Sequence, residues 1–244
     1  MGGIFVGIGG WNYEPWEESF YPPTIKKKEQ LGYAASKLTS IEINATYYRS
    51  QTPTTFANWA AAVPDGFRFS LKASRFATNR RILAEAGESV AKVMAQGFTE
   101  LGGKLGPIVW QFATSKQFDE ADMAAFIKLL PTSVEGQAVQ HAFEVRHDSF
   151  ADSAFERLMR DAGFAVVLAE DSEHSRIDMD TADFRYVRIM GTKADEAEGY
   201  SASELDAIAA KAQGWAAKGE AYVYFISGAK ERNPAAAMGL IERV

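Results

Sequence analysis

Cysteine is absent from this chain and histidine occurs only three times. Without cysteine there are no disulfides and no thiolate ligands for a metal, and a reducing cytoplasm is the expected location. The sequence also has no run of about 18 apolar residues, so we predict no transmembrane helix and no membrane partner. The first ten residues, MGGIFVGIGG, lack the basic flank and apolar segment of a signal peptide and are typical of a strand.

The chain also has fewer basic than acidic residues. The 26 Lys and Arg residues are outnumbered by 32 Asp and Glu residues, which gives a net charge of −6. Binding along a nucleic-acid backbone requires a basic face, so this balance disfavours a nucleic-acid partner but leaves room for a local basic pocket. The 244 residues are 47% hydrophobic, which is enough for one large core, and no change in composition marks a second domain. We therefore predict a single domain over residues 1–244.

Eight apolar, β-branched or aromatic stretches recur along the chain, most of them separated by helical patterns. They lie at residues 4–10, 40–48, 68–74, 107–112, 142–147, 164–171, 184–191 and 221–227. Regular alternation of strands and helices implies parallel pairing with right-handed crossovers. Eight such units in about 250 residues predict an α/β fold of the (β/α)8 TIM-barrel type, with eight parallel strands. The alternative is an open doubly wound sheet, but GIGG at 7–10 leads into WNYEPW and not into a helix.

Most of the predicted strands are followed by a helix with a recognisable start. The start signals are Thr52-Pro53, Asp119, the capping-box pairs Ser153/Glu156 and Ser201/Glu204, and Asn233-Pro234. A further helix is predicted at 88–101, and no regular helix is predicted after the sixth strand.

Polar residues fall late in the predicted strands, where the active groups of a barrel collect. They are Glu42, Asn44 and Thr46 on the second strand, Lys72 on the third, Gln111 on the fourth, Glu144, Arg146 and His147 on the fifth, Asp171 on the sixth, Arg188 on the seventh, and Tyr224 and Ser227 on the eighth. Alternation along the second strand predicts that Glu42, Asn44 and Thr46 share one face. Buried charges are costly unless they are paired. We therefore expect three acids and three bases to form a neutralising network at a ligand site: Glu42, Glu144, Asp171, Lys72, Arg146 and Arg188.

Structural explanations compete with the functional ones. We expect His141 and His174 to be structural, and Arg75, Arg80 and Arg81 to lie in a solvated loop. The aromatic residues Trp11, Trp16, Trp59, Tyr47 and Tyr48 are expected to serve packing more than substrate contact.

The motifs also resemble those of a known family, the domain-of-unknown-function 72 or YecE-like proteins. The matching stretches are GIGGWNY (7–13), FYP (20–22), IEINATYYR (41–49), Trp59, FRFSLKA (67–73), LGPIVWQF (105–112), FEVRH (143–147) and YVRIMG (186–191). The resemblance implies a TIM-type barrel with a pocket at its C-terminal mouth. The family's characteristic polar positions would correspond to Glu42, Asn44, Thr46, Lys72, Gln111, Glu144, Arg146, His147, Asp171 and Arg188. It implies no established reaction. This chain departs from the pattern at Met190, where the family usually has histidine, and at Phe112-Ala113-Thr114, Ser227 and Asn79.

Three functional hypotheses follow. The first is an enzyme acting on a small anionic molecule, phosphorylated or carboxylated, that needs no cofactor or metal; ester hydrolysis, lyase and isomerase chemistry all fit, and a desolvated Lys72 could form a Schiff base. Its candidate catalytic residues are Glu42, Glu144, Lys72, His147 and Asp171, and its candidate binding residues are Asn44, Thr46, Tyr48, Gln111, Arg146, Arg188 and Trp11.

The second hypothesis is a metal-dependent isomerase or nuclease that uses Glu42, Glu144, Asp171 and His147 as ligands. The third is a non-catalytic protein that binds a phosphate ligand or nucleic acid. Substrate and oligomeric state stay open.

Overall fold

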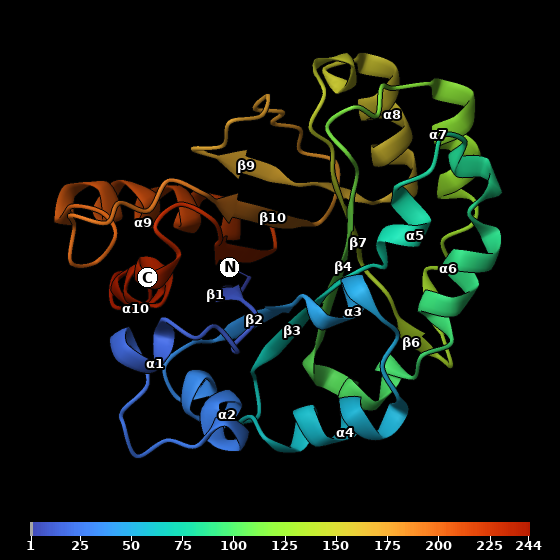
Figure 1. Ribbon diagram of the computed structural model, residues 1–244. Helices are drawn as coiled ribbons and strands as arrows, with labels where there is room; N and C mark the ends of the chain where they lie inside the picture. Colours follow the sequence, from blue (N-terminus) through green and yellow to red (C-terminus); the bar gives the residue numbers. More distant parts are fainter. Residues whose placement is uncertain (1) are drawn as a thin grey trace.

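Parallel strands form the centre of the computed structural model, which describes residues 2–244 (Figure 1). The strands are β1 (Ile4–Gly9), β2 (Ser40–Ile43), β3 (Arg68–Lys72), β4 (Leu105–Gln111), β7 (His141–Glu144), β8 (Ala165–Val166), β9 (Leu168–Glu170), β10 (Phe184–Ile189) and β11 (Glu220–Phe225). A separate antiparallel hairpin joins β5 (Ser133–Val134) to β6 (Gln137–Ala138).

The sheet closes into a barrel through the sixth predicted strand, residues 164–171, which contains β8 and β9. The strand order is β8-β7-β4-β3-β2-β1-β11-β10-β9, so β8 and β9 form its two edges. These edges are consecutive pieces of chain separated by Val167, whose N–H donates to the carbonyl of Phe143 on β7 at 2.9 Å. One short stretch thus pairs with β7 on one side and β10 on the other. The predicted (β/α)8 barrel is confirmed, and nine strands appear in place of eight because the sixth is in two pieces.

Most of the helices lie around the outside of the strands (Figure 1). The helices are α1 (Trp16–Ser19), α2 (Gln30–Ala35), α3 (Ala45–Tyr48), α4 (Pro53–Ala61), α5 (Arg75–Thr78), α6 (Gly87–Met94), α7 (Glu120–Ile127), α8 (Ser153–Ala162), α9 (Ala202–Ala216) and α10 (Asn233–Ile241). Short 3-10 turns occur at η1 (Lys27–Glu29), η2 (Leu83–Glu85), η3 (Phe98–Lys104), η4 (Asp148–Phe150) and η5 (Lys230–Arg232). None of the helices within residues 2–244 is long and apolar enough to cross a membrane.

Several of the predicted helix starts are confirmed. The side chains of Thr52, Asp119 and Ser201 each accept a backbone N–H at the start of α4, α7 and α9, and Ser201 forms a capping box with Glu204. The expected capping pair at Ser153 is wrong, because Asp152 caps α8 by accepting the Ala154 N–H at 2.7 Å.

The helix expected at 88–101 is interrupted. α6 ends at Met94, and Gly97 adopts φ +84° before η3 begins. A left-handed residue ends the α-helical hydrogen-bond pattern, and glycine adopts it without steric strain. No regular helix lies among residues 171–183, as expected.

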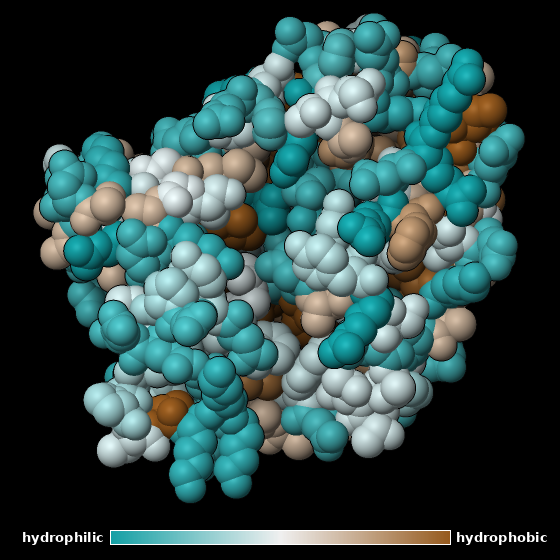
Figure 2. Space-filling model, in the orientation of Figure 1, coloured by the Kyte–Doolittle hydropathy of each residue, from teal (hydrophilic) through white to brown (hydrophobic). Residues whose placement is uncertain are grey.

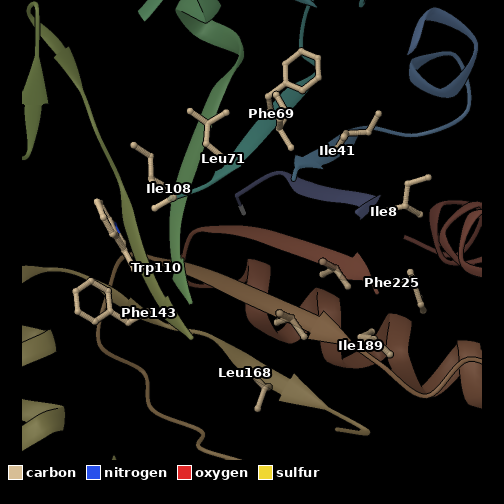
Figure 3. Close-up of a cluster of buried hydrophobic side chains, with 14 of the residues drawn as sticks. Ile8, Ile41, Phe69, Leu71, Ile108, Trp110, Phe143, Leu168, Ile189 and Phe225 are labelled. Atoms are coloured by element: carbon tan, nitrogen blue, oxygen red, sulfur yellow. The ribbon is translucent and has the colours of Figure 1, made fainter. Parts of the chain in front are cut away.

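Side chains alternate between the two faces of the barrel wall. Outward-facing residues such as Ile41, Leu71, Trp110 and Phe143 form the main core against the helices (Figure 3). Inward-facing residues fill the barrel itself, with a stack of aromatic rings at the centre in which Tyr186 lies 5.1 Å from Tyr224 and 6.3 Å from Tyr222, between ring centroids. The polar inward-facing residues lie above this stack, at the carboxyl ends of the strands.

Candidate active site

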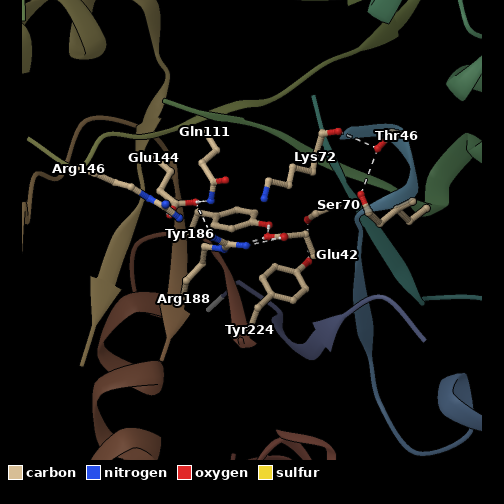
Figure 4. Close-up of polar contacts among 11 residues, drawn as sticks. Glu42, Thr46, Ser70, Lys72, Gln111, Glu144, Arg146, Tyr186, Arg188 and Tyr224 are labelled. Carbon is tan, nitrogen blue, oxygen red and sulfur yellow. Dashed lines mark hydrogen bonds and ion pairs between the residues drawn. The ribbon is translucent and has the colours of Figure 1, made fainter. Parts of the chain in front are cut away.

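A single arginine links two carboxylates inside the barrel. Arg188, near the end of β10, is 3% exposed, and Glu42 on β2 and Glu144 on β7 are 0% and 1% exposed. The guanidinium donates to Glu42 through Nη2 at 2.8 Å and Nε at 3.2 Å, and to Glu144 through Nη1 at 2.6 Å (Figure 4). Burial lowers the pKa of Arg188, but Glu144 and Glu42 outweigh it and raise that pKa, so Arg188 stays charged. The predicted convergence of these three residues is therefore found.

Glu144 carries two more partners. Arg146 donates to its Oε1 through Nε at 2.9 Å and Nη2 at 2.6 Å, and Gln111 donates to its Oε2 at 2.8 Å. Burial raises the pKa of Glu144, but Arg188, Arg146 and the hydrogen bond from Gln111 together bring it down to about 2. A carboxyl group with that pKa remains ionised at neutral pH and is poorly matched to proton transfer.

Lys72 reaches the same layer from the end of β3. Its Nζ lies 4.3 Å from the centroid of the Tyr47 ring, and no acceptor among residues 2–244 lies within hydrogen-bonding distance of it. Burial lowers the pKa of Lys72 to about 8; Arg188 adds to the shift, and the carboxylates of Glu42 and Glu144 oppose it. A large fraction of its amine is therefore neutral under mildly alkaline conditions.

Two tyrosines lie beneath this layer. Tyr224 is one of the late-strand polar residues noted in the sequence, whereas Tyr186 was not predicted. Tyr186 donates to Glu42 Oε2 at 2.8 Å, and the Tyr224 hydroxyl lies 2.6 Å from both Ser40 Oγ and Ser70 Oγ. Tyr186 has the same strand parity as Arg188 on β10, so the two-residue period of the strand could have identified it.

A cleft of about 420 Å³ opens above the charged layer. Seven of the predicted residues line it: Trp11, Asn44, Tyr48, Lys72, Gln111, Arg146 and Arg188. Asn12, Ser227 and Lys230 also line it. Lys230, which was not predicted, lies 3.9 Å from the centroid of the Tyr13 ring, and burial lowers its pKa. Figure 2 shows a hydrophilic hollow near the centre of the face viewed in Figure 1.

Three predicted site residues are placed differently from expectation. β2 ends at Ile43 and residues 45–48 form the turn α3, so Thr46 does not continue the strand alternation; its hydroxyl donates to the carbonyls of Ile43 at 3.1 Å and Lys72 at 2.7 Å. Asp171, at φ +56° and exposed, turns away from the charged layer and accepts the Tyr200 hydroxyl at 3.0 Å. His147 caps η4, where its Nδ1 accepts the Ser149 N–H at 3.1 Å.

The charge balance of the layer therefore differs from the expected neutral network. Without Asp171, two carboxylates face three cations, and Lys230 adds a fourth at the rim. Within residues 2–244, no three His, Asp or Glu side chains are grouped so that they could hold a metal ion. His141 is structural as expected: it accepts from Trp110 Nε1 at 3.0 Å and its other nitrogen lies 2.9 Å from the Pro131 carbonyl.

A second hollow, of about 240 Å³, lies beside the amino ends of β10 and β11 and is lined by residues such as Asp178, Arg185 and Trp215. Barrel enzymes place their chemistry at the carboxyl ends of the strands, so the cleft at the mouth is the better candidate.

Comparison with known proteins agrees with this architecture. A solved DUF72 family protein from Thermotoga maritima is 20% identical, with a TM-score of 0.78 over 98% of each chain. Another, from Enterococcus faecalis, is 17% identical, with a TM-score of 0.71 over 98% of this chain and 94% of that one. At these identities the likeness shows the fold alone.

Sequence comparison shows which family the chain belongs to. The UPF0759 protein YunF of Bacillus subtilis is 29% identical over 70 residues, a match that spans 29% of this chain and only 24% of YunF. The family model described as "Protein of unknown function DUF72" matches residues 5–244. The chain therefore belongs to the DUF72 family.

Proposed function

We propose that the cleft at the barrel mouth binds a small phosphorylated or carboxylated molecule and that the protein is an enzyme acting on it. The observation that carries the proposal is the surplus of positive charge in the layer: both carboxylates are occupied by arginines, and Lys72 is left without an anionic partner. A partly buried cation without a counter-ion is unfavourable, and a bound anion would relieve the cost.

The bound carboxylates act as supports in this proposal. Glu144 holds Arg146 through two hydrogen bonds, which fixes the guanidinium at the edge of the cleft. The Arg146 side chain is 22% exposed, so part of its guanidinium group is accessible to a ligand. A planar guanidinium held in this way suits bidentate contact with phosphate or carboxylate. Gln111 and Asn44, which line the same cleft, would orient the ligand.

Calorimetric titration with inorganic phosphate and with citrate tests the proposal. We expect saturable binding that Arg146→Ala weakens by about 10- to 100-fold, since a hydrogen bond to a charged group contributes roughly 1.5–3 kcal/mol. The matched control is Arg157→Ala, which removes an exposed arginine paired with Glu120 away from the cleft. Equal affinities in the wild type and in the Arg146→Ala variant, or no binding of either anion, would contradict the proposal.

A second candidate function has its own observation. Large exposed hydrophobic residues among those described include Tyr48 and Phe76, 64% and 60% exposed, and both line a hollow of about 410 Å³ together with Arg49 and Arg80. Tyr48 also lines the cleft at the mouth, so the two hollows adjoin. Exposed aromatic rings beside arginines are typical of surfaces that stack single-stranded bases.

Fluorescence anisotropy with labelled oligothymidylate distinguishes this second function. Binding that is lost in a Tyr48→Ala, Phe76→Ala double variant and falls steeply with added salt would support it. Binding of phosphate or citrate with no binding of the oligonucleotide would leave only the first function.

A further inference from the structure

The Nζ atom of Lys72 has no acceptor among the described residues, whereas the guanidinium groups of Arg146 and Arg188 both donate to carboxylates. Lys72 lies at the carboxyl end of β3, lines the cleft, and packs its Nζ against the Tyr47 ring. Its backbone carbonyl is held by Thr46 at 2.7 Å, so the base of the side chain is fixed to α3. The amine thus projects into the cleft from a rigid element.

The neighbouring carboxylates do not use this amine as a counter-ion. Glu42 accepts from both Arg188 and Tyr186, and Glu144 accepts from three side chains. All four carboxylate oxygens are therefore occupied, so a charged Lys72 would gain little by replacing any of these partners. A lysine required only for charge balance would be expected to bind one of them.

We propose that Lys72 is a nucleophile that forms an imine with the carbonyl carbon of an anionic aldehyde or ketone, such as a 2-oxo acid or a keto phosphate. This inference rests on the proposed function, because it names the class of anion that the cleft would take. Arg146 and Lys230, which line the same cleft, would hold the phosphate or carboxylate group while the carbonyl faces Nζ.

The step balances with solvent as the only other participant. The neutral Nζ donates its electron pair to the carbonyl carbon, and the proton that the nitrogen then loses is transferred, through solvent, to the carbonyl oxygen to give a neutral carbinolamine. One proton from solvent then protonates the hydroxyl group, which leaves as water while the nitrogen lone pair forms the C=N bond, and a protonated imine joins Lys72 to the ligand. A depressed lysine pKa favours this chemistry because only the neutral amine attacks.

Reductive trapping tests the inference directly. The full-length protein is treated with sodium cyanoborohydride and either pyruvate or dihydroxyacetone phosphate, and intact-mass and peptide spectra are recorded. We expect one adduct whose mass equals that of the probe less one oxygen atom, located on Lys72. Its rate of formation should rise as the pH approaches 8 and level off above it.

Variants separate the nucleophile from the anion site. Lys72→Arg keeps the positive charge but cannot form an imine, so it should retain phosphate binding and lose the adduct. Lys92→Met removes an exposed lysine on α6 and should leave adduct formation unchanged. Absence of any adduct, or adducts spread over surface lysines and unaffected by Lys72→Arg, would overturn the inference. Phosphate binding in the same samples would show that the proposed function survives that failure.

Discussion

Removing Arg188 is the sharpest test of how the charged layer is held together. In an Arg188→Met variant, Glu144 keeps the two hydrogen bonds from Arg146 and the one from Gln111. Glu42 keeps only the Tyr186 hydroxyl. The variant therefore leaves one well-supported carboxylate and one fully buried carboxylate that has lost its charged partner.

The expected loss in the free energy of unfolding follows because Glu42, unlike Glu144, is left without a charged partner. Removing one member of a buried ion pair typically destabilises a protein by about 3–5 kcal/mol, because the remaining charge is not compensated. In a chain of this length each kcal/mol corresponds to roughly 2–4 °C in melting temperature, so we expect a fall of roughly 10 °C. A second substitution, Glu42→Gln, neutralises the orphaned group and should restore about 2–3 kcal/mol, the upper range for coupling between residues in contact.

Urea unfolding of the single and double variants at pH 7 measures these free energies. The control pair is Arg188→Met with Glu144→Gln, which replaces the carboxylate partner of Arg146 by a neutral amide and should destabilise the protein further. Equal rescue by Glu42→Gln and Glu144→Gln, or no loss of stability in Arg188→Met, would show that the hydrogen bonds to Glu42 do not carry the network.

The remaining predictions concern groups around the layer. Lys72→Met should raise the free energy of unfolding at pH 7 by up to about 3 kcal/mol, because the folded protein then no longer holds a charged amine in a partly buried position. This advantage should shrink as the pH rises from about 8 towards the pKa of an unfolded lysine, and urea titrations at pH 7 and pH 10 would measure it. Burial lowers the pKa of His141 to about 4. The contribution of this neutral imidazole to the free energy of unfolding is therefore complete above the unfolded pKa of about 6.5, and roughly 3 kcal/mol of it should be lost as the pH falls to 4. A His141→Gln variant should lack that part of the acid sensitivity. Tyr224→Phe should cost about 1–2 kcal/mol, since it removes the hydroxyl shared by Ser40 and Ser70, and thermal unfolding followed by circular dichroism would measure the loss.

The barrel was predictable because eight hydrophobic segments alternate with helix signals, and that alternation leaves few possible topologies. The division of the sixth strand was not predictable. Residues 164–171 form a continuous apolar run, and only the closure of the barrel, which turns this run from β7 towards β10, separates it at Val167.

The candidate site was predictable where a residue lies inside a strand and parity fixes its face. Glu42, Glu144 and Arg188 are of this kind, and all three meet. Errors came just beyond strand ends. IEINATYY is rich in β-branched and aromatic residues and predicts a long strand, yet its second half forms a helical turn that removes Thr46 from the strand alternation. Asp171 was misplaced because its positive φ redirects the chain, which a pattern of side-chain types does not reveal.

The aromatic stack beneath the charged layer closes the barrel below the cleft, so the cleft is open only at the mouth. Tyr186, Tyr222 and Tyr224 fill the lumen where a wider barrel would have a channel. A reactant that arrives at the carboxyl ends of the strands must leave by the way it came, so a product still in place excludes the next reactant. Competition between the two for the same opening should therefore be visible in the kinetics of any reaction that this protein catalyses.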